Sequence, residues 1–247
     1  MRLAVISDIH SNLEALLAVL EDIKQVRADT VISLGDNIGY GADPEAVMNL
    51  LRRYGIESVL GNHELALLDP SYQQSFHPFA KKALAVNKEL LSSRSLDDIN
   101  HMPAWRVRNH MRFVHGCPPD SVITYIIHES PERVAAIMGK LPEPIAFVGH
   151  THYLELYELE QGEVKIRELV KWGVALDKNR RYIVNVGSVG QPRKSEILAT
   201  YVIWDSTERV IVPRFVEYDN RTAAGKIIDA GIPERIADRL NPRAGGR

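Results

Sequence analysis

The chain has 247 residues, of which 45% are apolar and 25% are charged, and its formal net charge is −2. This length suits one domain spanning 1–247, and the balanced charge gives no support for binding bulk nucleic acid. No apolar run approaches the ~20 residues that cross a bilayer, which argues against a membrane partner. The single cysteine, Cys117, excludes an internal disulfide. We therefore expect a cytoplasmic protein.

The first 62 residues alternate between apolar runs and amphipathic helical patterns. The apolar runs cover 3–7, 30–35 and 58–61, and the helical patterns cover 13–26 and 44–55. Strands that alternate with helices of this length predict βαβ crossovers and a largely parallel sheet. Pro44 suits the first turn of the second helix, and Gly55 suits its end.

Residues 64–103 are mostly helical in pattern and are interrupted by Pro70 and Pro78, which predicts a helical excursion beside the first half. The second half changes to short strands, with another helix at 128–140. The turns at 160–162 and 205–208 resemble hairpin connections, so the edge of this sheet should be antiparallel. Residues 222–240 predict a terminal helix or helix pair, and 241–247 a frayed tail. The strands are expected within 105–116, 145–150, 153–169, 181–187 and 199–218.

Polar residues follow five of the apolar runs. They are Asp8 and His10 after 3–7, Asp36 after 31–35, Asn62 and His63 after 58–61, His115 after 111–114, and His150 and His152 after 146–149. Ligands of open α/β sheets bind beyond the carboxyl ends of the strands, where loops from several strands meet. Each signal is weak alone, but together they predict one crevice lined by these groups.

The residue types indicate a metal site. The seven candidate ligands offer oxygen or imidazole donors and no thiolate, which argues against a closed structural zinc site and favours Mn, Fe or Zn over Mg or Ca. Seven donors suit two ions that share one carboxylate, and such pairs act on phosphorus. Asp36 is the natural bridge, since Gly35 and the glycine-rich turn after it let the backbone bring this carboxylate into the site.

The motifs resemble those of the calcineurin-like metallophosphoesterases. They are SDIH at 7–10, GD at 35–36, GNHE at 61–64, HG at 115–116 and GHTH at 149–152. LGDNIGYGADP and NVGSVGQPR are further similar to a small prokaryotic phosphodiesterase subgroup, some members of which are diadenosine tetraphosphatase-like. The resemblance implies an α/β fold, a four-layer αββα sandwich of two mixed sheets with flanking helices.

The resemblance also implies the roles of the site residues. One metal would be held by Asp8, His10, Asp36 and His152, and the other by Asp36, Asn62, His115 and His150. His63 would act on the phosphate or the leaving group without binding metal, and a metal-bound hydroxide would be the nucleophile.

The implied activity is metal-dependent hydrolysis of phosphate mono- or diesters, with a small phosphoester or a nucleotide as substrate. A dinucleoside polyphosphate hydrolase is the alternative. A non-catalytic scaffold on the same fold would be expected to lack some ligands.

One departure from the family pattern GDxxDR matters, because Gly39 replaces the second aspartate. In the protein phosphatases of this family that acid helps to orient the histidine that matches His63. The departure leaves His63 without a known orienting group and makes the protein phosphatase branch a poorer match.

A few further residues have both a functional and a structural interpretation. Asn12 and Asn37 could contact substrate, although Asn12 could equally cap the following helix. Glu64 could support a metal-bound histidine or simply be a favourable acid in a helix first turn. Arg193 and Lys194, after a glycine-rich turn, could bind phosphate or lie in an ordinary loop. We expect Cys117 to be a packed residue.

Overall fold

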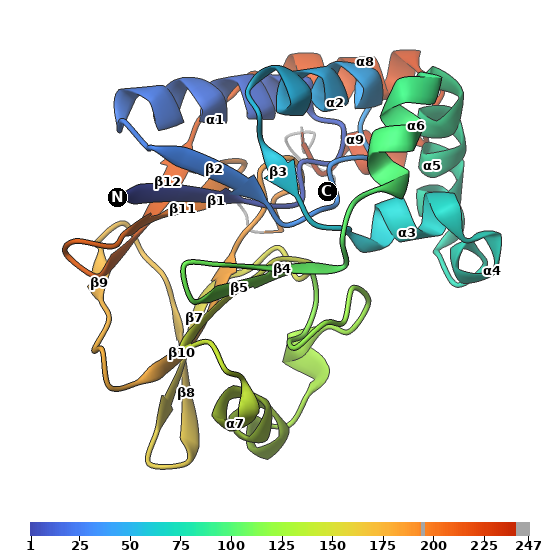
Figure 1. Ribbon diagram of the computed structural model, residues 1–247. Coiled ribbons are helices and arrows are strands. Elements are labelled where there is room, and N and C mark those ends of the chain that lie inside the picture. The colour runs from blue at the N-terminus through green and yellow to red at the C-terminus, as the bar shows by residue number, and fades with distance from the viewer. Residues whose placement is uncertain (194–195, 241–247) are drawn as a thin grey trace, which may run out of the picture.

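The computed structural model describes residues 1–193 and 196–240, so the predicted tail at 241–247 and Lys194 lie outside the described residues. Two six-stranded sheets pack face to face between layers of helices (Figure 1). In the described part of the chain, no helix is both long and apolar enough to cross a membrane.

The first sheet confirms the predicted βαβ units. Its strand order is β3-β2-β1-β11-β12-β9, in which β1, β2 and β3 are parallel and the rest antiparallel. The crossover helices are α1 (Leu13–Gln25) and α2 (Pro44–Arg53). The strands are β1 (Arg2–Ile6), β2 (Thr30–Ser33), β3 (Glu57–Ser58), β9 (Val174–Ala175), β11 (Ala199–Asp205) and β12 (Val210–Val216).

The third predicted strand is shorter than expected. It ends at Ser58. The amide of Val59 still donates to the carbonyl of Ser33 at 3.1 Å, but the amide of Leu60 donates to the carbonyl of Pro103, 2.8 Å away, and so leaves the ladder. This early exit directs Asn62 and His63 toward the loops after β1 and β2.

The second sheet is parallel at its centre and antiparallel at its edges, as the hairpin signal at 160–162 indicates. The prediction was wrong for the turn at 205–208, because the two strands that it joins, β11 and β12, extend the first sheet beside β1. Its order is β4-β5-β6-β10-β7-β8, with β5, β6 and β10 parallel. Gln161 and Gly162 form the predicted hairpin turn with left-handed φ values of 52° and 88°. The strands are β4 (Trp105–Arg108), β5 (Met111–Val114), β6 (Ile145–Val148), β7 (Leu154–Glu160), β8 (Glu163–Glu168) and β10 (Arg181–Val186).

Alternation along the strands separates the layers of the core. In β1, Leu3 and Val5 face the second sheet, whereas Ala4 and Ile6 face the helices over the first sheet. On the outer side of the second sheet, α7 (Pro131–Lys140) packs against alternate residues of β5, β6 and β10. These helix, sheet, sheet and helix layers confirm the αββα sandwich.

The helices beyond the sheets follow the sequence signals with two refinements. The excursion is α3 (Asn62–Leu68), α4 (Pro70–Gln73), α5 (Pro78–Leu90) and α6 (Ser93–Asn100), gathered at one end of the sheets (Figure 1). The helix predicted from 128 begins at Pro131, because Ser130 caps it and a separate 3₁₀ turn covers Ile126–His128. The terminal segment is a pair, α8 (Asn220–Asp229) and α9 (Glu234–Ala237), separated at Gly231.

Candidate metal centre

The loops after β1, β2, β5 and β6 meet at one end of the two sheets, where β3 also leads into α3. They bring together all seven predicted ligands and His63, and each of these side chains is at least nine-tenths buried. The strand ends converge because the parallel strands β1, β2 and β3, and β5 and β6, point in the same direction within their sheets.

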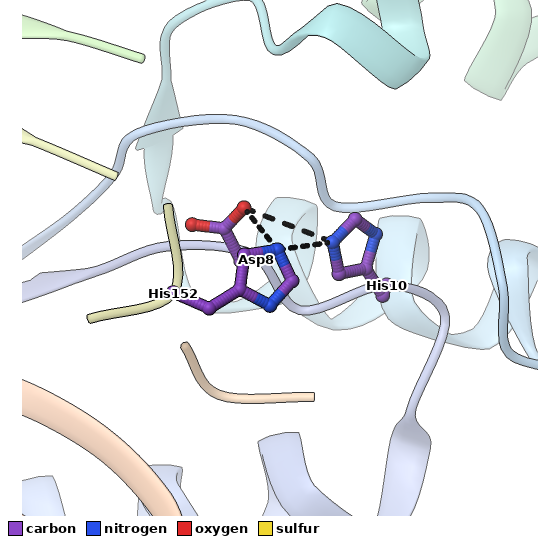
Figure 2. A group of neighbouring side chains, drawn as sticks. All are labelled: Asp8, His10 and His152. Carbon is purple, nitrogen blue, oxygen red and sulfur yellow. Dashed lines mark hydrogen bonds and ion pairs between the residues drawn. The ribbon is translucent and has the colours of Figure 1, made fainter. Parts of the chain in front are cut away.

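One cluster of donors comes from the loops after β1 and β6. Nε2 of His10 lies 3.2 Å from Nε2 of His152, and Oδ1 of Asp8 lies 3.2 Å from the latter and 3.7 Å from the former (Figure 2). The three donor atoms therefore surround one point, as the ligands of a metal ion would.

A second cluster comes from the loops after β2, β5 and β6. Nε2 of His115 lies 3.3 Å from Oδ2 of Asp36, 3.1 Å from Nδ1 of His150 and 3.1 Å from Oδ1 of Asn62. Oδ2 of Asp36 is also 3.8 Å from Nε2 of His10. Asp36 thus lies between the two clusters.

The tautomers of the four clustered histidines are set by backbone carbonyls, which can only accept a hydrogen bond. Nδ1–H donates to Ile38 in His10, to Leu34 in His115 and to Gln191 in His152, and Nε2–H donates to Ile123 in His150. In the neutral form of each ring, the nitrogen that faces the cluster therefore keeps its lone pair. This is the arrangement of histidines that bind metal.

The ligand loops have strained backbones. Asp8, His10, Asp36, His150 and His152 all have left-handed φ values between 50° and 66°. Residues other than glycine adopt this region at a cost that the surrounding structure must offset, and such residues gather at functional sites.

A close backbone approach explains the glycines around Asp36. Gly35 has φ of 93°, and a Cβ there would lie 2.4 Å from the amide nitrogen of Gly61. A Cβ on Gly61 would in turn lie 2.2 Å from Oδ1 of Asp36. Both glycines are needed to bring the Asp36 loop against the start of α3.

The carboxylate of Glu64 holds the Asp36 loop. It accepts hydrogen bonds from the amides of Gly61, Asp36 and Asn37 at 3.0, 2.9 and 2.7 Å. Glu64 is thus an acid in the first turn of α3, and it fixes the metal-site loop through the backbone rather than through a histidine ring. Burial, with the charge of Asp36, raises its pKa to about 7.

The electrostatics of the site favour a cation. Burial alone would lower the pKa of His115, but Asp36, with Asp8 and Glu64, raises it to about 9. Burial would raise the pKa of Asp36, but His115 and His63 hold it well below its usual value. The buried carboxylates therefore stabilise positive charge at the point where the ring nitrogens converge.

His63 lies beside both clusters, on the first turn of α3. Its ring centroid is 4.8 Å from that of His10, 4.6 Å from that of Tyr40 and 4.9 Å from that of Phe76. Its Nδ1 is buried and has no hydrogen-bond partner within residues 1–193 and 196–240. Burial lowers the pKa of this imidazole.

Two further candidates have structural roles. Asn12 caps α1 by accepting from the amide of Ala15 at 3.1 Å. The side chain of Asn37 is buried and bonded to Ser33, Ser58 and Glu64, away from the cavity. Cys117 is packed, and burial raises the pKa of its thiol to about 11.

A cavity of about 270 Å³ opens over the metal-site residues. Its walls carry four aromatic rings, and Arg193 is an exposed cation on its lining. The rings belong to Tyr40, Tyr72, Phe76 and Tyr125. No motif in the sequence marks these four rings. The only local signals are the i, i+4 spacing of Tyr72 and Phe76 and the position of Tyr40 beside Gly39.

Comparison with known proteins agrees with this geometry. The domain model of the calcineurin-like phosphoesterase superfamily matches residues 1–209. The chain is 34% identical over 242 residues to the uncharacterized protein MJ0912 of Methanocaldococcus jannaschii, with 96% of each chain covered. A solved metallophosphoesterase from Sphaerobacter thermophilus superposes with a TM-score of 0.85 and 32% identity, over 97% of this chain and 98% of that one.

The hypothetical protein PH1004 from Pyrococcus horikoshii OT3 shares the fold at 20% identity, with a TM-score of 0.81 and 97% of each chain covered. The superfamily domain model matches residues 1–209, which is most of the chain, and this match assigns the protein to a class. The chain belongs to the calcineurin-like phosphoesterase superfamily.

Proposed function

We propose that this protein is a phosphoesterase that works with two metal ions. The observation that carries the proposal is the position of Asp36, whose Oδ2 lies 3.3 Å from Nε2 of His115 and 3.8 Å from Nε2 of His10. One carboxylate oxygen thus reaches both donor clusters, as a ligand shared by two ions must.

The donor set fits Mn, Fe or Zn, because it combines imidazole with carboxylate and amide oxygens. One ion would be held by Asp8, His10, Asp36 and His152, and the other by Asp36, Asn62, His115 and His150. Two such ions would polarise a phosphoryl oxygen and lower the pKa of water to about 7. The carbonyls that accept from the four imidazoles keep the ligand nitrogens free and the rings in place.

The protein itself contributes groups that act on the substrate. His63 lines the cavity, where its imidazole would donate to a phosphoryl oxygen or to the leaving group. Arg193 adds a positive charge at the cavity lining, which favours an anionic ligand.

The cavity favours a small phosphate mono- or diester. Its volume of about 270 Å³ is near the lower end of small-molecule sites, which start at about 300 Å³. Its aromatic walls suit one planar or apolar organic group, and this volume favours one such group over the two nucleosides of a dinucleoside polyphosphate. The convergence of every predicted ligand supports an enzyme over a non-catalytic scaffold.

The test is hydrolysis of p-nitrophenyl phosphate and bis-p-nitrophenyl phosphate by purified protein with added Mn²⁺, Fe²⁺ or Zn²⁺. We expect turnover that a chelator abolishes and that Asp36→Asn reduces strongly. Asp205→Asn is the matched control, since Asp205 pairs with Arg2 at the start of β1, away from the ligand loops. Absence of turnover with every metal would overturn the proposal.

A further inference from the structure

The backbone of Gly39 lies against the ring of His63, at the position where many members of the family have an aspartate. A Cβ on Gly39 would lie 2.0 Å from Nδ1 of His63, and the φ of 91° there is itself strained for any other residue. An acidic side chain therefore has no room at this position while His63 keeps its place. Some other group must hold the ring.

The ring of His63 is enclosed by other rings rather than bonded through Nδ1. Tyr40, Phe76 and His10 contact it in tilted or edge-on arrangements, with interplanar angles of 57°, 63° and 71°. Tyr40 also contacts His10, at a centroid distance of 4.7 Å. Gly39 and Tyr40 both lie against the ring of His63, so the position of this ring depends on the shape of the turn at 39–41.

The amide of Gly41 ties that turn to the carbonyl of His10 at 3.0 Å, and one buried side chain reaches both of its ends. Oδ1 of Asn87, on α5, accepts from the amide of Gly39 at 2.6 Å, and Nδ2 donates to the carbonyl of Gly41 at 2.8 Å. The same Oδ1 accepts from the hydroxyl of Ser11 at 2.7 Å. Asn87 thus closes both ends of the turn and joins it to the loop that carries His10.

We infer that Asn87 is the positioning residue for His63 and takes over the orienting role of the missing acid. It acts through the backbone of Gly39 and the ring of Tyr40, without touching the ring of His63 itself. Both polar atoms of Asn87 are used, so no apolar residue can replace it without leaving buried backbone groups unpaired. The consequence for rate rests on the proposed function, whereas the consequence for the geometry of His63 does not.

The kinetic test is a double-mutant cycle with an alkyl phosphodiester as substrate. Displacing a catalytic group by about 1 Å can lower the reaction rate by about 10²-fold. Asn87→Ala should therefore lower kcat by about 10- to 100-fold, with both metals retained. In a His63→Ala background the same change should cost less than about 2-fold, because its effect passes through His63. A full loss in both backgrounds would overturn the inference.

Leu84→Ala is the matched control for damage to α5. Leu84 lies one turn earlier on the same helix and is fully buried in the core. Its removal should lower stability without changing kcat at a temperature where the variant is folded. If Leu84→Ala lowers kcat as much as Asn87→Ala does, the effect belongs to the helix and the inference is wrong.

A second readout needs no activity. Two-bond ¹H–¹⁵N spectra of the histidine rings should show the His63 signals shifted in Asn87→Ala and unchanged in Leu84→Ala. Asn87→Asp has nearly the same side-chain volume and keeps the Oδ1 acceptor but loses the Nδ2 donor. If Asn87→Ala does not fold, Asn87→Asp replaces it in both the kinetic and the spectroscopic test. Unchanged His63 signals would refute the inference. If the wild-type protein hydrolyses no phosphoester, the proposed function fails but these spectra still decide the role of Asn87.

Discussion

The Nε2 atoms of His10 and His152 face each other at 3.2 Å. When both rings are neutral, each uses its one N–H on a carbonyl, of Ile38 for His10 and of Gln191 for His152, so neither Nε2 can donate to the other. Two lone pairs and the carboxylate of Asp8 therefore converge without a proton between them. A cation at this point would turn a repulsive contact into a set of bonds.

We therefore expect a bound metal to stabilise the fold. An ion that binds only the folded state at 100 times its Kd should add about 2.7 kcal/mol to the free energy of unfolding. Urea unfolding followed with Mn²⁺ and with a chelator measures this difference. Mg²⁺, which the nitrogen-rich site disfavours, is the control. Equal stability with Mn²⁺ and with the chelator would contradict metal binding here.

Asp36→Ala should impair both metal sites. Wild-type protein saturated with Mn²⁺ should approach two ions per chain by elemental analysis, and the variant should retain neither ion tightly, because the shared oxygen is gone. His152→Ala makes the comparison sharper, since the ring of His152 belongs to one donor cluster alone and its removal should spare the other. Two tightly held ions in Asp36→Ala would rule out the shared ligand.

His63→Ala should distinguish two roles for this residue. If His63 protonates the leaving group, the variant should lose about 10²–10⁴-fold in rate with an alkyl phosphoester and much less with a p-nitrophenyl ester, whose leaving group hardly needs a proton. Equal losses on both esters would assign His63 to stabilising the phosphoryl oxygens. Metal content must stay at the wild-type value, and a lost ion would instead make His63 a ligand.

Asp22 should stabilise the fold in a pH-dependent way. Its carboxylate joins α1 to the first sheet by accepting from Arg214 at 2.6 and 2.9 Å and from Tyr201 at 2.7 Å. Burial would raise the pKa of Asp22, but these hydrogen bonds outweigh it and hold the pKa below its usual value. Asp22→Asn should cost about 1 kcal/mol of stability at pH 7, since Arg214 is partly exposed and screened.

The sign of this pH dependence follows from the lowered pKa. The contribution of Asp22 is complete above the unfolded-state value of about 3.9 and is lost as the pH falls through the lower folded-state value. Urea unfolding at pH 7 and pH 3 should therefore show a smaller difference between wild type and Asp22→Asn at pH 3. Asp120→Asn, at an exposed position, should change stability by less than about 0.5 kcal/mol at either pH.

Much of the candidate site could be predicted because it depends on two general facts. Parallel strands end at one edge of a sheet, so residues that follow apolar runs, such as Asp8 and Asp36, must meet whatever the details of packing. Carboxylate, amide and imidazole groups also have fixed donor chemistry. The sequence by itself therefore determined the donor set, and the layers of the fold followed from the resemblance of its motifs to a family.

Only the tertiary structure decided what holds these donors in place. Asn87 reaches the turn at 39–41 from a helix 46 residues further along the chain, and Tyr125 stacks on His150 at a centroid distance of 3.6 Å from a separate loop. No local periodicity marks either residue, because each acts through contacts set by how α5 and the loop before α7 pack onto the site. Such contacts depend on side-chain geometry between distant segments, which hydrophobic pattern and motif spacing do not encode.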